Sequence, residues 1–377
     1  MKRYLFKHIK KDLKEKMVFI GGPRQVGKTT LAFEFLKRGD EDHPAYLTWD
    51  FPESRPALVR GYLPANEKLI ILDEIHKYKG WRNLVKGLYD KNRKKKSFLI
   101  TGSAKLDYYR RGGDSLQGRY YYYRLHPLSL RELSKKPKAS HTEQLLQFGG
   151  FPEPCLKANT TFWRRWQRER VKRVIQEDVV LLENVKEIDS LGLLAQMLPE
   201  RVGSPLSIKG LREDLNVAHE TADKWVRILE NLYYCFRILP YGPDKIRAVK
   251  KERKLYLWDW SLCEQKGARF ENLVGSHLLK YCHFVEDTEG YNMDLRFIRD
   301  VDKRELDFIV LKEGKPLFAV ECKTGDKNLS KQIKYFAART PIPKFYQVHL
   351  GKTYVEDVDN RTVILPFHRF CEDLMIP

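Results

Sequence analysis

The feature that most constrains this chain is a G-x-x-x-x-G-K-T pattern that occupies residues 22–29. It follows the apolar run Met17–Ile20 and precedes the amphipathic stretch LAFEFLKRG, which should form a helix that stops at Gly39. A strand before the pattern and a helix after it are the context that a phosphate-binding loop requires. Its glycines let backbone N–H groups wrap around phosphate oxygens, and the start of the helix adds positive potential. The pattern therefore predicts a P-loop nucleotide site.

Two side chains of this loop have predicted roles of their own. Lys28 should reach the β- and γ-phosphates of ATP, and Thr29 should be a ligand of Mg²⁺. We expect further contacts from the loop backbone and from a polar residue at the end of a later strand. The complete predicted nucleotide set is Gly22, Pro23, Arg24, Gln25, Val26, Gly27, Lys28, Thr29, Thr30 and Ser103.

A second apolar run, Leu69–Leu72, ends in the acidic residues Asp73 and Glu74. An acid at the tip of such a strand binds Mg²⁺, usually through water. The neighbouring Glu74 can orient and deprotonate the water that attacks ATP. The run SFLITGS then supplies Thr101 and Ser103 at another strand tip. The sequence leaves open which of these two hydroxyls lies between the acids and the γ-phosphate.

Four apolar runs alternate with amphipathic stretches in the first third of the chain. Continuous apolar strands between helices predict a parallel sheet covered on both faces, so the expected fold class is α/β. The runs are residues 17–20, 45–49, 69–72 and 97–101. The basic, proline-containing segment Ser134–Ser140 predicts a linker, which gives a P-loop ATPase domain over residues 1–140.

Residues 141–253 should form a helical segment followed by a winged helix-turn-helix, because SIKGLREDLNVAHETADKWVRIL has the spacing of helix, turn and helix. The residues of its second helix expected to face the core are Ala222, Trp225, Val226 and Leu229. The residues expected to face outward are His219, Glu220, Thr221, Asp223 and Lys224. This outward face is mixed in sign, so DNA contact and protein interaction both stay open.

The charge of the chain favours a polyanionic partner. Lys and Arg number 70 against 50 Asp and Glu, a formal net charge of +20, and such a balance is typical of proteins that bind nucleic acid. One predicted helix concentrates this charge, either as a DNA-binding surface or as a solvated face. Its cations are Arg164, Arg165, Arg168, Arg170, Lys172 and Arg173.

The last region, residues 254–377, predicts a second α/β unit. Asp307 lies in one predicted strand, and Glu321 and Lys323 lie in the next. Residues two apart on a strand share a face, so these three side chains should project to one side of a hairpin. Two carboxylates there can bind Mg²⁺ or Mn²⁺, and the lysine can help to activate water. A charged hairpin with ordinary exposed ions has the same pattern.

The motifs GGPRQVGKTTL, LDEIHK, LITGSA, SLQGRYYYYRLHPLSLREL and FGGFPEP resemble those of bacterial and archaeal AAA-type ATPases with a C-terminal domain of unknown function. That domain is similar to PD-(D/E)XK nucleases, and the resemblance covers nearly the whole chain. It implies a winged helix between two α/β domains. It also implies an assembly in which an arginine of one subunit completes its neighbour's site, for which Arg119 is the candidate. At the nuclease-like site it implies that Glu271 joins Asp307 and Glu321, with Gln332 and Tyr335 following.

Other patterns narrow the remaining possibilities. The six cysteines form no C-x-x-C pair, which argues against a zinc site and a disulfide framework. No apolar run approaches the roughly 20 residues that span a bilayer. We therefore expect a cytoplasmic protein without a membrane partner, and the family resemblance implies that it is a homo-oligomer.

Together these features predict an Mg-dependent ATP hydrolase that acts on DNA by binding, remodelling or translocation, with nuclease activity left open. The alternative is an ATP-dependent regulatory switch. In that case the nuclease-like domain would be inactive and would bind protein or DNA.

Overall fold

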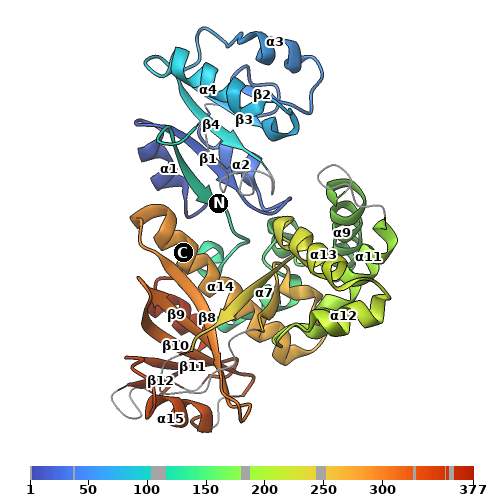
Figure 1. Ribbon diagram of the computed structural model, residues 1–377. Coiled ribbons are helices and arrows are strands. Elements are labelled where there is room, and N and C mark those ends of the chain that lie inside the picture. The colour runs from blue at the N-terminus through green and yellow to red at the C-terminus, as the bar shows by residue number, and fades with distance from the viewer. Residues whose placement is uncertain are drawn as a thin grey trace. The chain divides into compact units, whose positions relative to one another are not determined.

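The computed structural model describes residues 2–36, 39–102, 116–179, 187–242, 252–325, 328–352, 354–355 and 361–377 (Figure 1). The chain divides into two compact units. One comprises Met1–His126 with Asn231–Tyr233, and the other comprises Pro127–Glu230 with Tyr234–Pro377. The domain boundaries expected after residues 140 and 253 stay predictions.

The N-terminal unit is built on a five-stranded sheet of order β2-β3-β4-β1-β5 in which every pairing is parallel. Its strands are β1 (Met17–Gly21), β2 (Tyr46–Thr48), β3 (Leu69–Asp73), β4 (Ser97–Thr101) and β5 (Tyr120–Arg124). Its helices are α1 (Phe6–Asp12), α2 (Lys28–Phe33), α3 (Ser54–Arg60), η1 (Ile75–Lys77) and α4 (Trp81–Asn92). The predicted parallel α/β sheet is confirmed for this unit.

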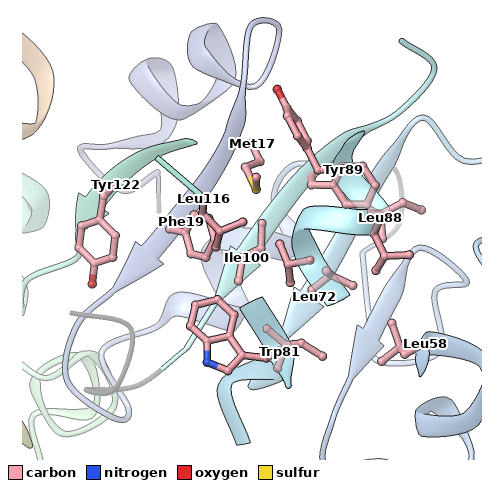
Figure 2. Close-up of a cluster of buried hydrophobic side chains, with 14 residues drawn as sticks. Met17, Phe19, Leu58, Leu72, Trp81, Leu88, Tyr89, Ile100, Leu116 and Tyr122 are labelled. Atoms are coloured by element: carbon pink, nitrogen blue, oxygen red, sulfur yellow. The ribbon is translucent and has the colours of Figure 1, made fainter. Parts of the chain in front are cut away.

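Both faces of this sheet are buried, as continuous apolar strands require. Figure 2 shows the cluster on one face, where side chains of α4 such as Trp81 and Leu88 pack with Phe19, Leu72 and Ile100 of the strands. The alternate strand residues, which point to the other face, are also fully buried. They are Val18, Ile20, Ile71 and Leu99.

Two local features differ from the sequence expectation. The helix after the P-loop ends at Phe33, short of the predicted Gly39, because the next turns close by the tighter i→i+3 bonds Phe35 N to Ala32 O and Leu36 N to Phe33 O. The tyrosine-rich run Tyr120–Arg124 was not predicted as a strand, yet it forms β5 beside β1.

The C-terminal unit contains a seven-stranded mixed sheet of order β12-β11-β10-β9-β8-β6-β7. Strands β8, β9 and β10 pair antiparallel, whereas β10, β11 and β12 pair in parallel. The strands are β6 (Cys235–Pro240), β7 (Lys254–Leu257), β8 (Met293–Arg299), β9 (Glu305–Lys312), β10 (Lys315–Lys323), β11 (Phe345–His349) and β12 (Thr362–Pro366). The strand pair that follows the helix-turn-helix therefore belongs to this sheet, because β6 pairs with both β7 and β8.

Helices make up most of the remaining part of this unit. They are α6 (Leu130–Leu133), α7 (Ala139–Phe148), α8 (Pro152–Lys157), α9 (Thr160–Arg173), the π-helix η3 (Val174–Asp178), α11 (Ile188–Met197), η4 (Leu198–Arg201), α12 (Ile208–Leu215), α13 (His219–Asn231), η5 (Trp260–Leu262), α14 (Lys266–Glu289), α15 (Lys331–Ala337) and α16 (Phe367–Asp373). Among the described residues, no helix combines the length and apolar character needed to cross a membrane.

The helix-turn-helix pair lies where the sequence predicts it. Helix α12 ends at Leu215, and Asn216 takes the left-handed conformation that starts the turn into α13. The predicted inward residues of α13 are buried, and His219, Glu220 and Lys224 are exposed. The amphipathic spacing of α13 is thus confirmed, while its assignment to a winged helix stays a prediction.

Arg170 corrects one expectation for the arginine-rich helix α9. Its side chain is buried rather than part of a surface for DNA. The guanidinium lies 4.1 Å from the ring centroid of Phe151, and its Nη1 lies 3.8 Å from Oδ2 of Asp259. Arg170 therefore ties α9 to the core, and the five other cations of the helix remain exposed.

Gly150 offers a test of how tightly this core is packed. A Cβ at this position would lie 2.4 Å from Cη2 of Trp260 and 2.9 Å from the carbonyl oxygen of Leu128. We expect Gly150→Ala to destabilise the unit by about 1–3 kcal/mol, because extra volume forces neighbouring groups to move. Thermal unfolding measures the effect.

Gly267 in α14 is the matched control, because a Cβ there would meet nothing within 4 Å. Gly267→Ala should be neutral or stabilising by about 0.5–1 kcal/mol, since alanine favours helix over glycine. Equal midpoints for the two variants would contradict the tight packing around Gly150.

Candidate functional site

The P-loop conformation depends on its glycines. Gly22 and Gly27 have φ angles of 142° and 93°, which L-residues with a Cβ rarely adopt. A Cβ at Gly22 would also lie only 2.4 Å from the carbonyl oxygen of Leu125, in the segment after β5. The sequence places glycine where the backbone must turn and approach a neighbouring strand.

Lys28 is held over this loop. Its side chain is buried, and Nζ donates to the carbonyl oxygens of Gly22 at 3.0 Å and Pro23 at 2.8 Å. These contacts keep the ammonium at the loop, where it can meet phosphate oxygens. The remaining predicted contacts lie in the loop or in the first turn of α2, and they are Arg24, Gln25, Val26, Gly27, Thr29 and Thr30.

Asp73 is the centre of a hydrogen-bond network at the carboxyl ends of the strands. Its Oδ2 accepts from Thr29 Oγ1 at 3.0 Å and from the Tyr46 hydroxyl at 2.7 Å. Its Oδ1 accepts from Thr101 Oγ1. The two predicted Mg²⁺ ligands of the P-loop site, Thr29 and Asp73, are therefore adjacent. Of the two hydroxyls left open by the sequence, Thr101 lies at the acids, and Ser103 lies outside the described residues.

Tyr46 was missed by the sequence analysis. It lies at the start of β2, and Thr48 of the same strand pairs directly with Asp73. The only signal was its position in the run AYLTW, next to the strand that carries the acids. A single tyrosine in an apolar run does not indicate a contact with a carboxylate 27 residues away.

Glu74 follows Asp73 in a left-handed conformation, with φ of 53°. Its carboxylate lies 3.5 Å from both Nε2 of His76 and Nζ of Lys77. Burial raises the pKa of Glu74 above its ordinary value, and the nearby charge of Lys28 opposes this shift. A carboxylate with a raised pKa close to the P-loop lysine suits the predicted role of general base.

Arg119 is not brought to this site. It immediately precedes β5, which runs parallel to β1, so it lies at the end of the sheet where strands begin. The P-loop follows the opposite end of β1. The Nε of Arg119 lies 2.9 Å from Oδ1 of Asp90. Its predicted role in a neighbouring subunit's site stays a prediction.

The C-terminal unit brings together the three predicted carboxylates. Asp307 on β9 and Glu321 on β10 lie one position beyond the paired residues Phe308 and Val320. Glu271 approaches from α14. Burial raises the pKa values of Glu271 and Glu321, and the charge of Asp307 raises both further. The acidic cluster, defined here as Glu271, Glu305, Asp307 and Glu321, is therefore a real feature of the fold.

Sequence reasoning missed two members of this site, Glu305 and Lys254, and Lys254 is the more consequential. Its Nζ lies 2.7 Å from Glu271, 2.6 Å from Glu305 and 3.4 Å from Asp307, and its side chain is fully buried. Burial by itself favours the neutral amine, yet the surrounding groups hold the pKa of Lys254 above its ordinary value. The available signal was a lysine that opens the otherwise apolar strand KLYLW.

The other predicted members of the cluster are Lys323, Gln332 and Tyr335. Lys323 Nζ lies 2.6 Å from Oε1 of Glu321, as expected for neighbours on one strand face. Gln332 and Tyr335 lie in α15, where the Tyr335 ring packs under the guanidinium of Arg304. In the part of the chain that the structure describes, no group of three or more His, Cys, Asp or Glu side chains is arranged to hold a metal ion. The predicted C-terminal metal site is therefore not supported.

A groove of about 810 Å³ lies between α9 and α11. Three cations of α9 line it at intervals of one helical turn, and its other wall includes Leu193, which is 49% exposed. The cations are Arg164, Arg168 and Lys172. Within the described part of the chain, none of the three forms an ion pair, and no aromatic residue lines the groove.

Three family models match successive parts of the chain. Residues 14–134 match the AAA domain, and residues 139–269 and 266–370 each match a domain of unknown function. With its parallel sheet and P-loop, the N-terminal part is an AAA-type P-loop domain, which supports ATP binding and hydrolysis.

Similar proteins add little about function. An uncharacterized protein of Methanocaldococcus jannaschii is 23% identical over 97% of this chain and 91% of its own length. One from Mycobacterium tuberculosis is 24% identical over 65% of this chain and 55% of its own length. The Thermotoga maritima RuvB Holliday junction branch migration motor shares 17% identity and covers 61% of this chain and 89% of its own, with a TM-score of 0.29.

Tyr46→Phe should weaken the use of Mg²⁺. The hydroxyl orients the carboxylate of Asp73, and loss of such an orienting contact typically costs 10–100-fold in metal affinity. We expect the Mg²⁺ concentration for half-maximal ATP turnover to rise about tenfold. Tyr62→Phe is the control, because Tyr62 is 67% exposed. Identical Mg²⁺ dependence in the two variants would exclude the orienting role.

Proposed function

We propose that this chain is an Mg-dependent ATP hydrolase that acts on DNA. The observation that carries the proposal is the arrangement of Thr29, Asp73 and Glu74 at the end of the parallel sheet. Thr29 and Asp73 supply oxygens for Mg²⁺, and Lys28 supplies positive charge to the β- and γ-phosphates. Glu74 activates the attacking water.

Glu74→Gln tests the hydrolytic part of the proposal. The amide keeps the shape of the side chain but cannot accept the proton of the attacking water. Turnover should fall about a hundredfold or more, the usual range for loss of a general base, while nucleotide binding persists. Lys28→Ala should instead lose binding or hydrolysis, because a positive charge at the phosphates is removed. ATP turnover and equilibrium nucleotide binding separate the two effects.

Glu53→Gln is the matched control, since Glu53 is exposed and lies in the turn before α3. It should behave like the parent protein. Parental turnover by Glu74→Gln would remove Glu74 from the mechanism.

The proposed action on DNA is supported by charge and by the groove. A net charge of +20 favours a polyanion. Arg164, Arg168 and Lys172, which form no ion pair within the described residues, line one edge of the groove. Proteins that grip single strands stack bases on aromatic rings, and the described lining of this groove has none. We therefore propose contacts to the phosphate backbone of a duplex rather than to unpaired bases.

Salt dependence tests this interface. Six phosphate contacts would give a slope of log affinity against log salt of about −5. Reversing the charge of Arg164 and Arg168 together should make that slope shallower by about 2, because the variant makes two fewer phosphate contacts and its binding therefore releases fewer counterions. Fluorescence anisotropy of labelled duplex DNA at several salt concentrations measures it.

Arg369→Glu is the control for a general change of charge. Arg369 is exposed, lies outside the groove and pairs with Glu372. If it alters the slope as much as the groove variant, or if no duplex binds at low salt, the groove is not the DNA site.

A second candidate is a regulatory ATP switch whose C-terminal domain does not cleave DNA. The observation that favours it is Lys254, which lies among the carboxylates expected to bind a catalytic metal. Cleavage is therefore not part of our proposal. ATP turnover with and without duplex, single-stranded and branched DNA distinguishes the candidates, because only the DNA-acting hydrolase should be stimulated.

A further inference from the structure

The acidic cluster has a buried ammonium at its centre. The Nζ of Lys254 lies 2.7 Å from Oε1 of Glu271, 2.6 Å from Oε1 of Glu305 and 3.4 Å from Oδ1 of Asp307. An ammonium has three N–H donors and no acceptor, so three carboxylate oxygens match its capacity. The lysine thus lies against three of the four carboxylates of the acidic cluster.

Several carboxylate oxygens of the cluster also have other protein partners. Oε1 of Glu271 accepts from the Tyr256 hydroxyl at 2.7 Å, in addition to its contact with Lys254. Oδ2 of Asp307 accepts from the backbone N–H of Cys322 at 2.8 Å. Oε1 of Glu321 lies 2.6 Å from Nζ of Lys323. Lys323 offsets the charge of Glu321, and the neutral donors Tyr256 and the Cys322 N–H use lone pairs that a metal ion would otherwise take.

One buried oxygen of the cluster stands apart from this pattern. Oε2 of Glu321 is buried and has no hydrogen-bond partner within the described residues. A single such oxygen does not make a site for Mg²⁺ or Mn²⁺, which require several oxygen ligands around the ion. The residues present therefore do not fit a resident divalent cation.

We propose that Lys254 is the permanent counter-ion of the acidic cluster and that it takes the place of a divalent metal in the nuclease-like unit. The cluster is then complete without metal, and its carboxylates are held in position by protein cations. Because Lys254 fills the site, the cluster binds this ammonium of the protein in preference to a metal ion from solvent. This inference concerns the C-terminal unit alone and does not depend on ATP hydrolysis.

Lys254→Met tests the proposal, because methionine keeps much of the length of the side chain and removes its charge. The variant leaves three partly buried carboxylates without their shared partner, so a cation from solvent should replace it. Titration of the nucleotide-free full-length protein with Mn²⁺, followed by the electron paramagnetic resonance signal of the free ion, should show one new site. We expect it to be at least about tenfold tighter than any site of the parent protein.

Two variants control for location and for loss of a buried lysine. Adding Asp307→Asn to Lys254→Met should abolish the new site. Lys280→Met should bind Mn²⁺ like the parent, because Lys280 is also buried but pairs with Glu132, which is not part of the acidic cluster. A new site in Lys280→Met, or none in a folded Lys254→Met, would overturn the proposal.

The parent protein provides a test that does not require the variant to fold. Without nucleotide, neither Mn²⁺ nor a chelator should shift its thermal midpoint, since a ligand that binds only the folded state raises that midpoint. If Mn²⁺ stabilises the parent but not Asp307→Asn, the cluster holds a metal and Lys254 is not its counter-ion. Because no ATP is present, these results do not bear on Glu74 or on the proposed hydrolysis.

Discussion

The carboxylate of Asp73 is the contact on which the nucleotide site depends. Its two oxygens accept hydrogen bonds from three separate segments: from Thr29 in the P-loop, from Tyr46 at the start of β2 and from Thr101 at the end of β4. Parallel strands make this convergence possible, because their carboxyl ends meet at one edge of the sheet. Hydrogen bonds from these three donors offset the cost of burying the carboxylate there.

The P-loop and the acidic cluster each contain a buried lysine, and the two lysines contact different kinds of oxygen. At the P-loop, the ammonium of Lys28 donates to the carbonyl oxygens of Gly22 and Pro23, which carry no net charge. In the acidic cluster, Lys254 contacts three carboxylates, so its charge is already matched. The first lysine suits an external anion, whereas the second completes an internal network. Burial alone does not distinguish them, because both side chains are buried.

Sequence patterns predicted those parts of the structure that depend on local order along the chain. The four apolar runs became strands β1 to β4. As expected, the P-loop follows β1, and Asp73 and Glu74 lie at the end of β3. Contacts between distant segments were not predictable where no motif marks the residues. Tyr46 reaches Asp73 across 27 positions, and Lys254 reaches Asp307 across 53. The same limitation applies to Arg170, whose helical spacing resembled that of its exposed neighbours although it pairs with Asp259 in the core.

The acidic cluster shows why a sequence motif can be present without the metal chemistry that usually accompanies it. The spacing of Asp307, Glu321 and Lys323 reports only that three side chains share a strand face, and the structure agrees with that geometry. Whether the face binds metal depends on the net charge and free oxygens around it, which here are set by Lys254 on another strand. A fold can keep its carboxylates after a protein cation replaces the metal, because the same attraction that held the ion then holds the lysine. The pattern D…E-x-K therefore identifies the shape of the site, and the residue at its centre decides what the site can do.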